Sequence, residues 1–154
     1  MDDSMLQEDG RFKMNPPIRS REDRDALVEG LLDGTIDCIA TDHAPHSAEE
    51  KSKGLEKSAM GVVGIETAFP ILYTYLVKPG VVPMETVLKA LTVNPAKRFG
   101  LPLDGWSVWD LNETYTVDPA DFVSQGKASP FTGWEVCGKN LMTVLGGKVV
   151  WKAE

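Results

Sequence analysis

The chain has 154 residues, which is the length of one ordinary domain. It carries 16 lysine and arginine residues against 23 aspartate and glutamate residues, so its formal charge is −7 and it lacks the net basic balance of proteins that bind nucleic-acid phosphates. A hydrophobic content of 42% and a charged content of 25% are typical of globular proteins and exclude wholesale disorder.

The sequence shows no membrane or export signal. The longest uncharged, mostly apolar run, residues 67–77, is too short to cross a bilayer. The first residues have neither the basic start nor the apolar stretch that directs secretion. Cys38 and Cys137 follow no metal-binding spacing, so both are expected to be buried as small apolar residues. We therefore expect a cytoplasmic protein without membrane or nucleic-acid partners.

The N-terminal part of the chain predicts a loop, a helix and a strand. The first fifteen residues are polar and indicate a loop, after which two prolines beginning at Pro16 favour an extended backbone. Ser20 is a favourable helix N-cap and Gly34 a natural helix stop, with apolar residues spaced on one face between them. The short, mostly apolar run 36–40 predicts a strand.

Helical patterns dominate the middle of the chain. Residues 49–57 are rich in lysine and glutamate and predict a solvated loop. An apolar helical pattern follows at 65–77, where Pro70 either lies in the first turn or kinks the helix. A second amphipathic helix is expected at 84–91, followed by a short helical turn at 94–100 that ends in glycine.

After residue 102 the pattern changes from helical to extended. Strand candidates occur at 107–111, 115–117 and 136–137. Two β-rich runs, 141–145 and 148–151, flank a pair of glycines and predict a hairpin. The four tryptophans in this part are expected in core or sheet packing, and they are Trp106, Trp109, Trp134 and Trp151. The chain is therefore divided into a βα part, residues 1–102, and a small β part, residues 103–154.

Residues that can carry chemistry gather just after the predicted strand at 36–40. Asp42, His43 and His46 follow its C-terminal end, where α/β proteins place ligands and catalytic groups. An aspartate there can bind a divalent cation or accept a proton from metal-bound water. The alternative is structural, because an aspartate in such a turn often accepts hydrogen bonds from nearby backbone amides. Spacing alone leaves both open and does not show that the three side chains converge on one metal.

Five short motifs follow one another along residues 3–151. They are Lys13-Met14-Asn15-Pro16-Pro17-Ile18-Arg19, Ile39-Ala40-Thr41-Asp42-His43-Ala44-Pro45-His46, Gly61-Val62-Val63-Gly64-Ile65-Glu66-Thr67, Thr92-Val93-Asn94-Pro95-Ala96-Lys97 and Ser129-Pro130-Phe131. Together they resemble the bacterial dihydroorotases of the cyclic amidohydrolase superfamily. The resemblance implies an α/β chain that supplies the last strand–helix units of a (β/α)8 metal-dependent hydrolase barrel, plus part of a small β domain.

The resemblance also implies a reaction, a cofactor and site residues. The family interconverts N-carbamoyl-aspartate and dihydroorotate in pyrimidine synthesis at a binuclear Zn2+ site. Asp42 would ligate one zinc and act as general base, accepting a proton during attack on the amide carbonyl and delivering it to the leaving nitrogen. Asn15 would hydrogen-bond the substrate and His46 would contact its carboxylate. Met60 and Gly61 would close over the pyrimidine ring.

Less specific interpretations remain beside these roles. Without the resemblance, Asn15 before two prolines is best explained as a turn cap. His43 is expected to support the site from behind the ligands or to pack, rather than to bind metal. Glu66 is expected to be a first-turn acid that complements the helix dipole. The related hydantoinases and allantoinases share the motif cores but usually differ at the positions of Asn15 and His46.

The chain lacks most of the metal ligands that the family uses. Family members supply a His-x-His pair, a bridging acid and two further histidines from earlier strands, whereas this chain contains only His43 and His46. A whole barrel takes about 250 residues, so we expect the C-terminal part of such an enzyme. Asp42 alone should hold zinc weakly, and the isolated chain is expected to be inactive. The expected partner is the missing N-terminal half or a further copy in a homo-oligomer. The alternative is a non-catalytic scaffold or interaction module.

Overall fold

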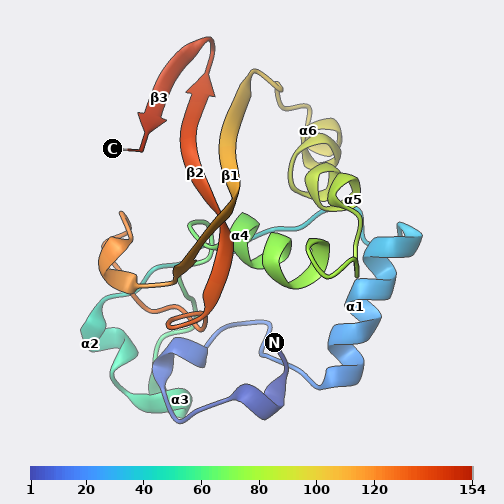
Figure 1. Ribbon diagram of the computed structural model, residues 1–154. Coiled ribbons are helices and arrows are strands. Elements are labelled where there is room, and N and C mark those ends of the chain that lie inside the picture. The colour runs from blue at the N-terminus through green and yellow to red at the C-terminus, as the bar shows by residue number, and fades with distance from the viewer. Residues whose placement is uncertain (154) are drawn as a thin grey trace.

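A computed structural model describes residues 1–153, and its central feature is a three-stranded antiparallel sheet flanked by short helices (Figure 1). The helices are α1 (Arg21–Asp33), α2 (Ala48–Lys51), α3 (Gly54–Lys57), α4 (Ala68–Leu72), α5 (Met84–Leu88) and α6 (Asn94–Phe99). The strands are β1 (Gly105–Thr116), β2 (Glu135–Leu145) and β3 (Lys148–Lys152). Between residues 1 and 153, no helix combines the length and apolar character needed to span a bilayer.

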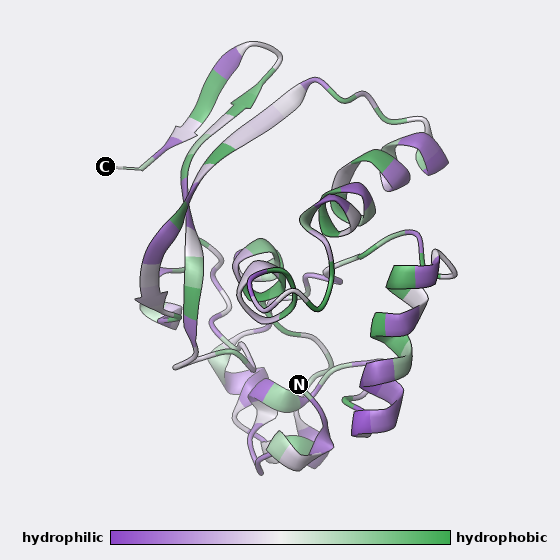
Figure 2. Cartoon of the chain, turned by 45° about the vertical axis from the view of Figure 1, so that its right-hand side comes forward, coloured by the Kyte–Doolittle hydropathy of each residue, from purple (hydrophilic) through white to green (hydrophobic). Residues whose placement is uncertain are grey.

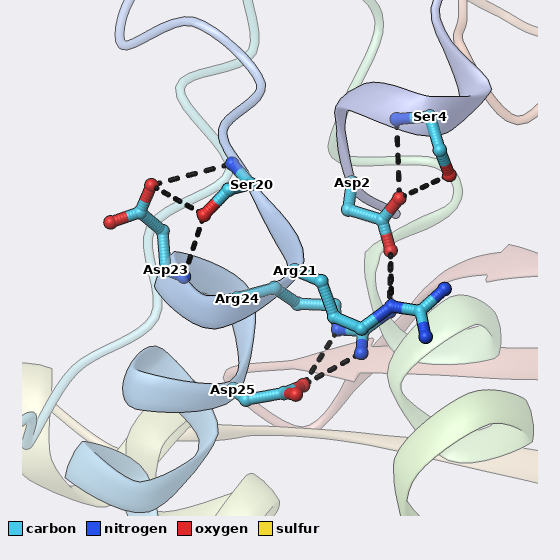
Figure 3. A network of polar contacts seen from close by, with 7 residues as sticks. All are labelled: Asp2, Ser4, Ser20, Arg21, Asp23, Arg24 and Asp25. Atoms are coloured by element: carbon cyan, nitrogen blue, oxygen red, sulfur yellow. Dashed lines mark hydrogen bonds and ion pairs between the residues drawn. The ribbon is translucent and has the colours of Figure 1, made fainter.

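Helix α1 begins and ends at the predicted residues. The Ser20 hydroxyl accepts a hydrogen bond from the Asp23 amide at 3.2 Å, and the Asp23 carboxylate accepts one from the Ser20 amide at 3.3 Å (Figure 3). This reciprocal capping box satisfies amides that the first helical turn leaves without partners. Gly34 ends the helix in the left-handed conformation, with φ +83°.

The N-terminal segment is anchored to α1 by a buried carboxylate (Figure 3). The Asp2 carboxylate accepts hydrogen bonds from the Ser4 hydroxyl and, at 2.7 Å, from the Arg24 guanidinium. The Ser4 hydroxyl, together with the nearby Arg24 and Arg21 guanidinium groups, holds the pKa of Asp2 below its ordinary value. The predicted N-terminal loop therefore has a fixed path, which includes short 3-10 turns at Asp3–Met5 and Gly10–Phe12.

The expected strand at 36–40 is wrong, because these residues form no regular strand. The Ile36 amide donates to Gly30 O and the Ile39 amide to Ala90 O, so this segment bonds to helices. A strand needs a neighbouring strand, and within residues 1–153 the only pairing near this segment is an isolated parallel bridge between His43 and Val62.

Two helical runs follow, each with a π-helical turn. Pro70 lies in the first turn of α4, where its missing amide has no helical partner to lose. Helix α4 continues into a π-turn, η3 (Tyr73–Val77), so the predicted helix at 65–77 is confirmed except for its first three residues. Helices α5 and α6 likewise join through η4 (Lys89–Val93), and Gly100 ends α6 with φ +65°, as expected.

The sheet confirms the predicted hairpin and merges two pairs of predicted strands, since those expected at 136–137 and 141–145 form one strand, β2. Leu145 pairs with Lys148 across Gly146-Gly147, whose positive φ angles of 54° and 74° suit a tight hairpin turn. The strands expected at 107–111 and 115–117 form one strand, β1. Its register shifts between Asp110 and Thr114, where the Asp110 carboxylate accepts hydrogen bonds from the Asn112 and Glu113 amides.

The main core cluster joins the sheet to the segment before α4. Val63, Val117, Phe122 and Val136 are buried together. Cys137 is also buried, as expected, whereas Cys38 is only half-buried.

The four tryptophans divide into two pairs. Trp109 packs on Phe69 and Trp134 on Tyr75, as expected for packing residues. Trp106 and Trp151 lie in strands of the sheet but are 56% and 44% exposed, so neither is a core residue. Both belong to the end of the sheet that stands away from the helices, where Figure 2 shows apolar segments on the β2–β3 hairpin.

Candidate functional site

Asp42 lies on the turn that follows the irregular 36–40 segment. Its φ of +43° is the only positive φ of a non-glycine residue between residues 1 and 153. The side chain is exposed, and no hydrogen bond joins its carboxylate to another described residue. The alternative of a carboxylate that closes its own turn is therefore not seen. A strained backbone that presents an unpartnered carboxylate suits a functional residue.

His43 is bonded to the protein through both ring nitrogens. Its Nδ1 accepts hydrogen bonds from the amides of Gly64, at 3.2 Å, and Ile65, at 3.4 Å. This arrangement places the ring proton on Nε2, which lies 3.3 Å from the Ser124 hydroxyl. With neither nitrogen free to bind metal, the geometry supports the expected packing role behind the site.

The chain of hydrogen bonds continues from Ser124 to Glu66. The Ser124 hydroxyl donates to the Glu66 carboxylate, which also accepts from the amides of Val123 and Ser124 at 2.8 and 3.1 Å. Burial opposes ionisation of Glu66, but the Ser124 hydroxyl and the two amides outweigh it and hold the pKa of this carboxyl below its ordinary value. Glu66 precedes α4 by two residues, so the expected dipole role is wrong. Its carboxylate instead anchors the loop after β1.

His46 faces an open pocket of about 480 Å³ that is shared with Gln125 and Gly126. Its Nε2 donates to Met60 O at 2.9 Å, and its Nδ1 lies 3.6 Å from the Glu50 carboxylate. The imidazole therefore sits between helix α2 and the loop that carries Met60.

Asn15 and Met60 line a second, mostly apolar pocket of about 340 Å³, together with Lys13 and Leu55. Both Asn15 and Met60 are exposed. The Gly61 amide donates to Lys13 O at 3.1 Å, which ties the Met60-Gly61 loop to the segment that leads to Asn15.

Gly61 is required where this loop meets the turn after Asp42. Its φ is +134°, and a Cβ atom would lie 2.7 Å from Ala44 Cβ and 3.0 Å from His46 Nε2. The absence of a side chain thus permits close contact with the 44–46 turn. The structure brings His46 and Met60-Gly61 into contact, places Asn15 beside Met60, and leaves Asp42 on the same turn as His46.

The sequence pattern did not predict the buried position of Lys51, which lies next to these segments. Residues 49–57 are mostly exposed, as expected, but most of them belong to α2 and α3 and do not form a loop, and Lys51 at the end of α2 is only 7% exposed. The signal was present in Ser47-Ala48-Glu49-Glu50, a capping box in which Ser47 and Glu50 bond reciprocally.

Residues 1–153 do not contain a group of side chains that could bind a metal ion by themselves. Through residue 153, no three histidine, cysteine, aspartate or glutamate side chains are grouped as metal ligands. Catalytic zinc normally takes three protein ligands. Among the described residues, the exposed Asp42 carboxylate is available as one such donor.

Curated proteins that are similar to this chain are dihydroorotases. The chain is 50% identical over 161 aligned positions to the dihydroorotase of Bacillus cytotoxicus and 52% identical to that of Shouchella clausii, and each match covers 99% of the chain. The chain is homologous to a segment of the bacterial dihydroorotases. It spans 38% of the length of these relatives. No family model matches it.

Solved structures of hydantoinases superpose on this dihydroorotase-like chain. The L-hydantoinase of Arthrobacter aurescens superposes with a TM-score of 0.83 and 33% identity, over 91% of this chain and 34% of the other. A D-hydantoinase from Thermus sp. gives a TM-score of 0.84 at 26% identity, over 93% and 34%. The predicted resemblance to the dihydroorotases and the α/β class are confirmed.

Proposed function

We propose that this chain forms part of a dihydroorotase and serves the reversible cyclisation of N-carbamoyl-aspartate to dihydroorotate. The observation that carries the proposal is the turn at 42–46, which presents an unpartnered Asp42 carboxylate and packs His46 on the Met60-Gly61 loop. The half-identical dihydroorotase relatives support it. They do not favour the alternative of a non-catalytic scaffold.

Residues 1–102 belong, in this proposal, to the last strand–helix units of a (β/α)8 barrel, and residues 103–154 to a small β domain. The hydantoinase superpositions support the assignment because they cover about a third of each larger enzyme. The missing partner is an N-terminal half or a further copy, and the proposed setting is the cytoplasm.

Asp42 is the proposed general base and one ligand of a binuclear zinc site completed by residues outside this chain. Its carboxylate accepts a proton as water attacks the amide carbonyl and returns that proton to the leaving nitrogen. His46 and Asn15 recognise the substrate, and His46 contacts its carboxylate. The Met60-Gly61 backbone covers the ring.

The test is turnover of N-carbamoyl-aspartate by this chain alone and after mixing with an N-terminal segment of the Bacillus cytotoxicus dihydroorotase that supplies the other ligands. We expect no turnover by the chain alone, turnover in the mixture, and at least a thousandfold loss with Asp42→Asn. A mixture that binds zinc but hydrolyses hydantoin in preference to dihydroorotate would assign the site to the sister enzymes. An assembled, zinc-loaded mixture without either activity would refute the proposal.

A further inference from the structure

Lys51 is a buried ammonium group with all three of its donors used. It lies at the end of α2 and is 7% exposed. Its Nζ donates to the backbone oxygens of Lys13 at 3.0 Å, Ala59 at 2.7 Å and Gly61 at 2.7 Å. A lysine has three N–H donors and no acceptor, so this geometry satisfies the group completely.

All three acceptors are neutral carbonyl oxygens. Among the ion pairs formed by residues 1–153, none includes Lys51. Burial lowers the pKa of Lys51, with the nearby Asp9 carboxylate opposing this shift and the Lys13 ammonium adding to it. Burying a charge without a counter-charge costs free energy, so a methionine of similar length would fill the same space at a lower cost.

The lysine fixes the loop that carries two proposed substrate-binding residues. Three consecutive carbonyl groups, of Ala59, Met60 and Gly61, are bound in turn by Lys51, His46 and Lys51 again. Lys13 O accepts from both the Lys51 ammonium and the Gly61 amide. One cation therefore joins the Met60-Gly61 loop to α2 and to the segment two residues before Asn15.

We propose that Lys51 is a positioning residue that holds the Met60-Gly61 loop beside Asn15, and that its positive charge, which has no ion-pair partner, lies next to the segments that carry these proposed binding residues for a carboxylate-bearing substrate. The proposal rests on the proposed function, because it concerns the same site. The charge favours an anionic ligand, since its hydrogen-bond partners are neutral and do not cancel it.

The first test is amide hydrogen exchange in the 154-residue chain. Lys51→Met removes the donors and keeps the aliphatic length, Lys51→Arg keeps a cation, and Lys57→Met changes an exposed lysine on the neighbouring helix α3. We expect the Ala59 and Gly61 amides to exchange at least tenfold faster in Lys51→Met, with α1 and β2 unchanged. We expect exchange within threefold of the parent in the other two variants.

The second test measures steady-state kinetics in the mixture with the N-terminal segment. Lys51→Met should raise KM for dihydroorotate at least tenfold while kcat changes less than threefold, because the loop binds substrate and does not react. Lys51→Arg should restore KM to within threefold. Lys57→Met should change neither constant.

Unchanged Gly61 exchange in Lys51→Met would overturn the proposal. So would an equal acceleration in α1 and β2, which would make Lys51 a general stabilising residue, or an unchanged KM in an active mixture. Exchange could change only in the loop while the unmodified mixture assembles without turnover. That result would refute the proposed function and still support the positioning of the loop by Lys51.

Discussion

Replacement of Gly61 by alanine tests how the Met60-Gly61 loop packs against the turn at residues 42–46. The φ of Gly61 is +134°, a backbone region that residues with a side chain adopt rarely. An alanine Cβ would lie 2.7 Å from both Cβ and O of Ala44 and 3.0 Å from His46 Nε2. The variant therefore suffers backbone strain and a collision with the Ala44 residue and the His46 ring.

The two effects have separable magnitudes. An unfavourable backbone region costs about 1–3 kcal/mol, and overpacking in a tight space costs about 1–3 kcal/mol more. Gly34→Ala is the control for a positive φ without crowding, because Gly34 has φ +83° and nothing lies within 4 Å of the position that an alanine methyl group would take there. That control isolates the backbone effect in the left-handed region, which costs about 1–2 kcal/mol.

Urea unfolding followed by circular dichroism measures both variants. We expect Gly61→Ala to lose at least about 1 kcal/mol more stability than Gly34→Ala, an amount set by the overpacking effect. The His46 ring resonances should shift in Gly61→Ala alone, because the imidazole bonds to Met60 O in the same loop. Equal stability losses with unmoved His46 resonances would refute the reasoning.

Three further predictions concern the core, an anchoring carboxylate and the metal. Val136→Ala, at a fully buried position, should lower the free energy of unfolding by about 1.5–3 kcal/mol, whereas Val123→Ala, at a side chain that is 88% exposed, should leave the urea midpoint nearly unchanged. Glu66→Gln should destabilise the chain at pH values above the unfolded-state pKa of the carboxyl. The difference in unfolding free energy between parent and variant should shrink as pH falls through the folded-state pKa, which lies below the ordinary value. A difference that does not depend on pH would contradict the assigned role. Metal analysis after gel filtration should find less than one zinc per isolated chain, and less again in Asp42→Asn, because one donor binds weakly; one retained zinc per chain would contradict this.

The sequence predicts the residues of the candidate site that lie in motifs. It does not predict those whose place depends on contacts with distant segments. Asn15, His46 and the Met60-Gly61 pair came from the family resemblance, and the structure places them on adjoining segments. Lys51 lies in a charged run, and such runs are usually exposed to solvent. Composition therefore predicts an exposed side chain, whereas Lys51 is buried. Glu66 likewise bonds to a loop 57 residues later, a contact that no local pattern reveals.

The sequence by itself determined the elements whose signals lie within a few residues. Ser20, Asp23 and Gly34 define both ends of α1, and Gly146-Gly147 define the hairpin, because caps and tight turns are closed by neighbouring backbone groups. Only the tertiary structure decided the state of residues 36–40 and the burial of Lys51. A strand needs a second strand beside it and a buried ammonium needs carbonyl groups from distant segments, so both depend on which parts of the chain come together.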